Sequence, residues 1–161
     1  MNGAPKAPGT RKDLGFKPSL KGRALRLLSQ REHSRAELER KLAPHEETPG
    51  ELAKALDELQ ARDFINDGRA IESVVHRRAG KLGAARVRQE LAAKGLSGEA
   101  VAQAMEGLRD TELSRAQEVW RKKFGQPPAD AHERARQMRF LITRGFAAEV
   151  VRRVVQGCED E

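Results

Sequence analysis

The chain has 161 residues, of which 38% are hydrophobic, 34% charged and 4% aromatic, and its formal net charge is +7. Strong helix formers dominate while strand-favouring residues are sparse, which excludes a β-rich fold and favours an all-α one. Cys158 is the only cysteine, so no intrachain disulfide can form, and there is neither a long apolar run nor a signal-peptide pattern. We therefore expect a cytoplasmic protein with no membrane partner.

The charge is distributed unevenly along the chain. Residues 24–67 carry seven basic and ten acidic side chains, whereas residues 68–98 carry seven and two, and residues 111–158 carry ten and five. A uniformly basic nucleic-acid binder would not contain an acidic segment of this length. The pattern indicates a protein that contacts both a partner protein and a polyanion.

Residues 1–19 contain several prolines, glycines and cations but no apolar period, and we interpret them as a disordered basic tail. After the tail, apolar spacing predicts helices at about 20–32, 35–43 and 49–62. Ser34 and Glu37 fit a capping box at the start of the second of these helices. Thr48 and Glu51 fit a similar box at the start of the third.

The same plan of three helices follows twice more. Residues 67–80 are predicted to form a helix, Gly83 opens the next helix, the pair Lys94 and Gly95 ends it, and Ser97 caps the one after that. From residue 111 onward, further helices are expected up to about 124, over 130–144, and across a run of valines. These valines are Val150, Val151, Val154 and Val155, and their spacing favours a helix although β-branched residues are mediocre helix formers.

An apolar spacing links the three groups of helices. Leu38, Leu42, Leu52, Leu56 and Leu59 recur 49 residues later as Val87, Leu91, Val101, Met105 and Leu108, and three of them recur after 50 more as Leu141, Val151 and Val155. A fixed period of this size predicts a tandem array of three three-helix repeats, elongated or crescent-shaped. We assign the repeats to 20–66, 67–110 and 111–158.

Four ordered segments of this array resemble the RecX family of regulatory proteins. They are LSQREHS at 28–34 with EL at 37–38 and KL at 41–42, FINDGR at 64–69, GAARVRQEL at 83–91 with KGL at 94–96, and RFL at 139–141 with RGF at 144–146. Two positions depart from the family pattern, which usually has Asp where Asn66 stands and an aromatic residue where Ala70 stands. With Ala70 in place of an aromatic residue, we expect thinner packing under the first helix of the second repeat.

The resemblance implies an array of three-helix repeats and a non-enzymatic modulator of RecA recombinase. Family members bind within the groove of the RecA–DNA filament and mostly inhibit its ATPase, strand-exchange and co-protease activities, in DNA repair and SOS control. The implied partners are therefore the RecA filament and single-stranded or double-stranded DNA. We expect the chain itself to be a monomer without a cofactor.

Cations in the second and third repeats are the candidate contacts to DNA or recombinase, because clustered Lys and Arg side chains suit phosphate oxygens or an acidic surface. These candidates are Arg77, Arg78, Lys81, Arg86, Arg88, Lys94, Arg121, Lys122, Lys123 and Arg139. The alternative for any one of them is a solvated helix face with local pairs such as Arg86 with Glu90. The consecutive cations at 121–123 cannot all face one partner, since successive residues spread around a helix.

No constellation of catalytic or metal-binding residues stands out. Asp63, Asn66 and Asp67 lack the ligand series of a calcium loop and fit a turn followed by a helix cap. Trp120 shares the apolar stripe of its helix and is predicted to lie in the core. Two other functions remain open, a general nucleic-acid-binding helical module and a helical adaptor, each acting independently of RecA.

Overall fold

The computed structural model describes residues 17–157, and within this range all regular secondary structure is helical. The helices are α1 (Leu20–Gln30), α2 (Arg35–Leu42) with the 3-10 turn η2 (Ala43–His45), α3 (Glu51–Ala61), α4 (Asp67–Arg78), α5 (Ala84–Ala93), α6 (Glu99–Asp110), α7 (Glu112–Lys123), α8 (Ala131–Thr143) and α9 (Ala148–Gln156). The predicted all-α fold is confirmed. Most of the predicted basic tail, together with Cys158, lies outside the described residues.

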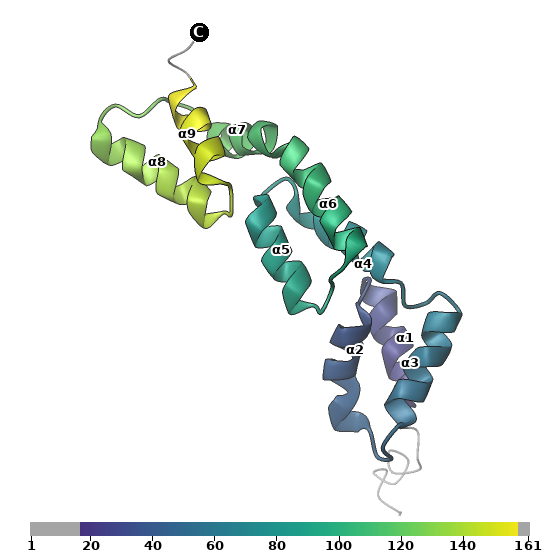
Figure 1. Cartoon of the computed structure of the whole chain (residues 1–161). Helices are drawn as coiled ribbons and strands as arrows, with labels where there is room; N and C mark the ends of the chain where they lie inside the picture. Colours follow the sequence, from purple (N-terminus) through teal and green to yellow (C-terminus); the bar gives the residue numbers. More distant parts are fainter. Residues whose placement is uncertain (1–16, 158–161) are drawn as a thin grey trace, which may run out of the picture.

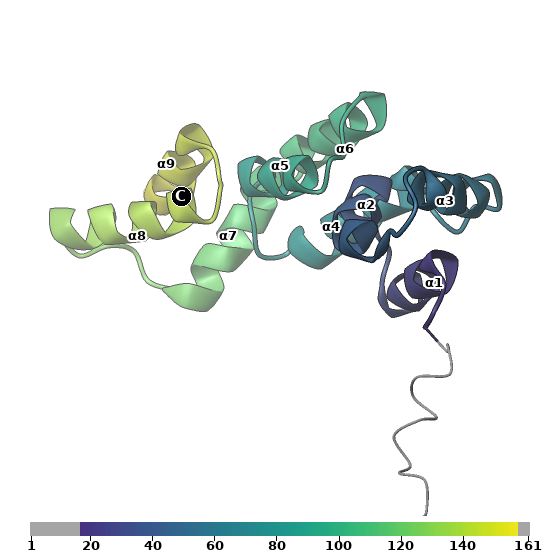
Figure 2. The ribbon, with the colours of Figure 1, turned by 90° about the horizontal axis from the view of Figure 1, so that it is seen from below.

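The helices form three units that follow one another in an elongated array: unit one (α1–α3), unit two (α4–α6) and unit three (α7–α9) (Figure 1, Figure 2). Each unit encloses its own apolar core, and the three cores share no residue. Among the side chains that are fully enclosed are Leu38, Leu56, Leu59, Val87, Leu91, Met105, Leu141 and Val151. The apolar residues that repeat in the sequence therefore point into successive cores, as their spacing predicts.

Two of the expected helix caps, at Thr48 and Ser97, are wrong, whereas the capping box at Ser34 is confirmed. The Ser34 hydroxyl and the Glu37 carboxylate form the predicted capping box of α2. By contrast, α3 begins only after Gly50, and the Glu46 carboxylate accepts a hydrogen bond at 2.8 Å from a backbone N–H in its first turn, so the Thr48 box does not form. The residue before α6 is Gly98, not Ser97, and no side chain caps that helix.

The valines near the end of the chain form α9, not a strand. Val151, Val154 and Val155 are buried, and Val150 packs against the same core. Their spacing places all four on one face of the helix. Burial of this face outweighs the weak helix propensity of β-branched residues.

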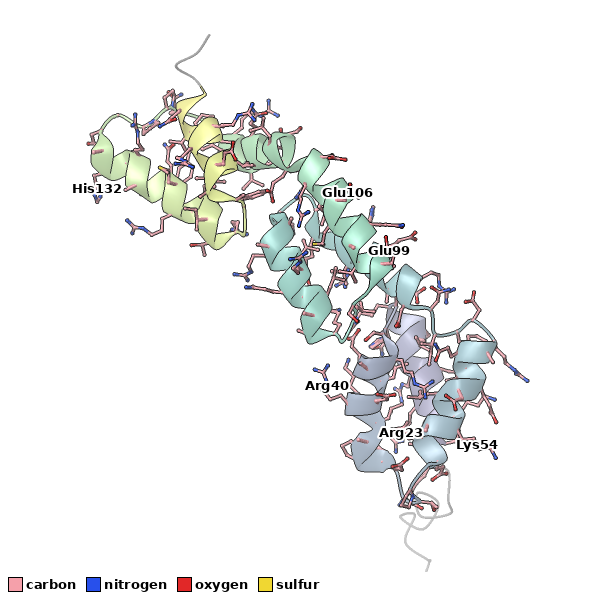
Figure 3. All side chains as sticks on the ribbon, viewed as in Figure 1. Arg23, Arg40, Lys54, Glu99, Glu106 and His132 are labelled. Atoms are coloured by element: carbon pink, nitrogen blue, oxygen red, sulfur yellow. The ribbon has the colours of Figure 1, made fainter. Side chains whose placement is uncertain are left out.

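Unit two is attached to unit one where the end of α5 lies against the start of α2. The Ser34 hydroxyl donates a hydrogen bond to the Lys94 carbonyl, and Arg40, labelled in Figure 3, donates one at 2.7 Å to the Ala93 carbonyl. The last carbonyl groups of a helix have no partner within the helix. Side chains of unit one supply these partners, and we call this contact joint one.

Unit three is attached to unit two by an equivalent contact, joint two. The Gly83 N–H donates a hydrogen bond at 2.8 Å to the Arg144 carbonyl, and Arg86 donates one at 3.2 Å to the Thr143 carbonyl. These two acceptors lie 50 residues after the two acceptors of joint one. The period of the sequence therefore extends from the cores to the contacts between units.

Each joint requires a glycine just after the helix that ends there. Gly95 and Gly145 have φ angles of +72° and +93°, in the left-handed region that commonly ends a helix. A Cβ atom on Gly95 would lie 2.5 Å from the Cβ of Ala36, and one on Gly145 would lie 2.3 Å from the Cγ of Arg86. The chain of one unit thus approaches the next too closely for a side chain at either position.

A buried carboxylate reinforces joint one. The Glu37 side chain, 9% exposed, accepts hydrogen bonds from Arg31 at 2.7 Å and from the Ser34 N–H at 3.1 Å, and lies 3.9 Å from the Lys94 ammonium. Burial by itself raises the pKa of Glu37, but these hydrogen bonds and positive charges lower the pKa to about 2. Glu37 is therefore held in its ionised form.

A partly buried guanidinium performs a similar role near joint two. Arg115 on α7 donates hydrogen bonds to the carbonyls of Ala79 at 2.8 Å, Leu82 at 2.6 Å and Leu108 at 2.8 Å. Ala79 and Leu82 belong to the connection between α4 and α5, so this side chain ties unit three to unit two. Burial lowers the pKa of Arg115, and the acceptor carbonyls compensate the guanidinium for lost hydration.

We predict that Gly145→Ala lowers the free energy of unfolding by about 2 to 4 kcal/mol, because it forces an alanine into a left-handed conformation and a Cβ atom into Arg86. Urea unfolding followed by circular dichroism measures the loss. Gly107→Ala is the control, since a Cβ atom there meets nothing within 4 Å. This control should be neutral or stabilising by up to about 1 kcal/mol, and an equal loss in both variants would contradict the prediction.

We predict that Glu37→Gln lowers the free energy of unfolding at neutral pH by on the order of 3 kcal/mol. Because the pKa of Glu37 is lowered on folding, its contribution is complete above pH 4.5 and is lost as the pH falls toward about 2. The gap between variant and wild type should therefore narrow over that range in unfolding curves. Glu106→Gln, at an exposed position of α6 (Figure 3), is the control and should match wild type throughout.

Candidate functional site

The cations predicted on the α4 side of unit two have different surroundings. Arg78 forms an ion pair with Glu90 at 3.1 Å, so Glu90 does not pair with Arg86 as the local alternative supposed. Arg77 is exposed, and its Nε donates only a long hydrogen bond of 3.4 Å to the Ser73 carbonyl. Lys81 is exposed in the turn after α4 and forms no ion pair with any described residue. Arg77 and Lys81 thus remain available to a partner.

The two arginines predicted on α5 lie on different flanks of this helix. Arg86 shares a flank with Glu90, four residues later, and contacts the end of α8 in joint two. Arg88 lies on the other flank, where it lines a groove together with Arg109 of α6. The structure therefore divides the predicted basic patch of unit two between two surfaces.

Lys94 is located inside joint one. Its side chain is 14% exposed and lies 3.9 Å from the Glu37 carboxylate. Burial lowers the pKa of Lys94, although the charge of Glu37 opposes this effect. The Lys94 ammonium is thus engaged with unit one, and little of it reaches the surface.

The predicted cations of unit three are exposed but are mostly engaged within the unit. Arg121 forms an ion pair with Glu118, and Lys122 lies 4.0 Å from the same carboxylate. The Lys123 ammonium lies 5.4 Å from the centre of the Phe140 ring. Arg139 on α8 is exposed and forms no ion pair or ring contact within residues 17–157, unlike the other three.

In the acidic unit one, two arginines form close ion pairs with carboxylates. Arg31 pairs with Glu37 at 2.7 Å, and Arg35 pairs with both Glu39 at 3.0 Å and Asp57 at 2.6 Å. Carboxylates also outnumber cations in this part of the chain, with ten acidic and seven basic side chains over residues 24–67. The second and third units instead carry a net positive charge.

The turn between α3 and α4 has the structural role that its sequence indicates. The Asn66 side chain caps α4 by accepting a hydrogen bond from the Arg69 N–H at 3.0 Å. Arg69 in turn pairs with Asp63 at 2.8 Å and with Glu32 at 3.0 Å. Asparagine thus replaces the usual family aspartate without loss of the cap, and Ala70 is buried in the core of unit two.

Two residues at joint two were not among the candidates predicted from the sequence. Arg109 follows the inward Met105 by one helical turn, and Ile142 directly follows the inward Leu141, so both lie at the edge of an apolar stripe. Each could have been found by asking which side chains border a stripe at the point where two repeats meet. Trp120 lies in the core of unit three as predicted, and its indole N–H donates at 2.8 Å to Gln137.

The described residues form a surface suited to binding. No group of His, Cys, Asp or Glu within residues 17–157 could hold a metal ion. Within the same range, no helix is both long and apolar enough to cross a bilayer. What the arrangement does provide is an elongated scaffold with accessible cations in its second and third units.

Three family models match the chain in succession. The first, second and third three-helix domains of RecX match residues 21–59, 66–105 and 110–155. Two curated relatives called Regulatory protein RecX, from Leptothrix cholodnii and Ralstonia nicotianae, are 57% and 50% identical to this chain. These two alignments cover 89% and 88% of this chain and 91% and 89% of the relatives.

Solved structures show the same fold. The crystal structure of RecX from Lactobacillus salivarius aligns with a TM-score of 0.73 at 20% identity, covering 87% of this chain and 94% of that chain. A second crystal structure, of a regulatory protein RecX, aligns with a TM-score of 0.68 at 19% identity, covering 100% of this chain and 83% of the other. With three matching domains in order and relatives of this identity, the chain belongs to the RecX family.

Proposed function

We propose that this protein is a non-enzymatic regulator that binds the RecA–DNA filament and restrains its ATP hydrolysis, strand exchange and co-protease activity. The relatives that it matches over most of their length are named regulatory proteins. The proposal extends that role to this chain and specifies how its units contribute. The expected setting is DNA repair and control of the SOS response.

The observation that carries the proposal is the separation of charge along a scaffold of three similar units. In unit one, ion pairs occupy Arg31 and Arg35. In unit two, Arg77 and Lys81 are exposed and without an ion pair among the described residues, and in unit three the same holds for Arg139. A filament offers both acidic protein surface and phosphate, so the basic units face the groove and unit one contacts mainly protein.

The joints give this surface a defined geometry. Hydrogen bonds to the Ala93 and Thr143 carbonyls fix each unit against the next. An elongated protein held in this way spans more than one subunit of a helical filament. By contacting neighbouring recombinase subunits at once, it opposes the rearrangement between them that accompanies ATP turnover.

We predict that the purified protein lowers the rate of single-stranded-DNA-dependent ATP hydrolysis by RecA, and that Arg77→Glu/Lys81→Glu weakens this effect about tenfold or more, as expected from loss of two charge-assisted contacts. The half-maximal concentration in a coupled ATPase assay measures the change. Lys54→Glu, an exposed site of unit one (Figure 3), should behave as wild type. Arg77→Gln/Lys81→Gln provides a milder test if the reversed pair does not fold. Absence of inhibition by saturating wild-type protein would refute the proposal.

We also predict strong binding to RecA–DNA filaments and weak binding to naked DNA. Fluorescence anisotropy of labelled single-stranded DNA, with and without RecA, compares the two across a range of salt concentrations. Loss of one phosphate contact should reduce the slope of log K against log salt by about 0.7. Equally tight, salt-steep binding to naked DNA would instead support the general nucleic-acid-binding module.

A further inference from the structure

A groove of about 640 Å³ lies at joint two, between α5 and α6 of unit two and the turn that connects α8 to α9. The hydrogen bond from Gly83 to the Arg144 carbonyl and the contacts of Arg115 hold its two sides together. Arg77 and Lys81 do not line it. The groove is therefore a second surface, separate from the cations of the α4 end.

Part of the groove lining is apolar. Ile142 contributes to its lining and is 49% exposed, a high fraction for a large aliphatic side chain. Met105 and Phe146 also line it, but both are buried and present only a small part of their surface. An exposed Ile142 lacks the stabilisation that burial of an aliphatic side chain provides. An aliphatic group of a partner would supply this stabilisation by covering Ile142.

Two guanidinium groups border this apolar surface. Arg88 and Arg109 are exposed and form no ion pair with any described residue. The one carboxylate in the lining, Glu112, is buried and accepts a hydrogen bond at 2.8 Å from the Ala84 N–H at the start of α5. Its charge is thus directed to the backbone and the helix N-terminus, which leaves the two arginines to an external anion.

The corresponding positions at joint one carry different side chains. Residues Glu39 and Gln60 stand 49 positions before Arg88 and Arg109, and Ala92 stands 50 before Ile142. Glu39 is moreover paired with Arg35 at 3.0 Å. The two joints share the carbonyl acceptors of their hydrogen bonds but not these three side chains, so the packing of one unit on the next does not require Arg88, Arg109 or Ile142.

We propose that the groove binds an acidic segment of a partner protein, in which a carboxylate contacts Arg88 and Arg109 and a neighbouring aliphatic side chain covers Ile142. Arginine binds carboxylates through paired hydrogen bonds. A nucleic-acid strand fits less well, because stacking of bases uses exposed aromatic faces and Phe146 is buried. This inference rests on the proposed function in one respect, namely that the partner is a protein.

The test is binding of a fluorescein-labelled peptide that alternates Glu and Leu to the full-length protein, followed by fluorescence anisotropy. Arg88→Gln/Arg109→Gln should weaken binding about tenfold or more, and Ile142→Ser should weaken it about threefold to tenfold. Lys54→Gln and Ala92→Ser, exposed sites of unit one and joint one, are controls that should leave binding unchanged. A peptide with Ser in place of each Leu should bind as weakly to wild type as the original binds to Ile142→Ser.

Three outcomes would overturn the inference: no binding of the Glu–Leu peptide, binding that the groove substitutions leave unchanged, or binding of an oligothymidylate in its place that depends on the same substitutions. The RecA ATPase assay is run alongside with wild type. Inhibition by wild type without peptide binding would refute the groove proposal alone. Peptide binding without inhibition would refute the proposed function while the groove proposal stands.

Discussion

The architecture depends on one kind of contact, the hydrogen bonds that side chains or backbone of one unit donate to the last carbonyl groups of the second helix in the next unit. These bonds are needed because the three apolar cores are separate, so within residues 17–157 no continuous hydrophobic core holds the array together. Terminal carbonyls are unsatisfied within any helix, which makes them ready acceptors. Joint one uses Ser34 and Arg40, whereas joint two uses the Gly83 N–H and Arg86. The acceptors repeat while the donors vary, which shows that position, not donor type, defines the joint.

Electrostatics complements this geometry. A carboxylate buried at joint one, Glu37, draws Arg31 and Lys94 into the contact, and a partly buried arginine at joint two, Arg115, donates hydrogen bonds to carbonyls. The charged groups that form the joints are therefore not available to an external partner. The net charge is negative over residues 24–67 and positive over residues 68–98 and 111–158. A similar scaffold therefore supports units with different surface chemistry, because the cores and joints use few of the surface positions.

The fold was largely predictable from the sequence because it depends on apolar periodicity, which short-range patterns report directly. Details that depend on local competition were not. The Thr48 box is displaced because Glu46 reaches the first turn of α3 instead, and Ser97 is not the cap because the chain turns at Gly98. The candidate site was predictable only as a set of cations. Lys94 could not be assigned to a joint, nor Arg88 separated from Arg86, without knowing which flank of α5 meets the next unit. Arg109 and Ile142 were missed because their significance arises from a contact between repeats.

Separate cores joined by a few polar contacts also determine how the molecule would respond to a mechanical load. Tension applied along the array is transmitted in series, so each joint carries the full force. Hydrogen bonds such as that from Gly83 to the Arg144 carbonyl rupture over a short extension, whereas a packed core resists over a longer one. A pull along the array would therefore separate the units at the joints first, while each unit remains folded around its own core.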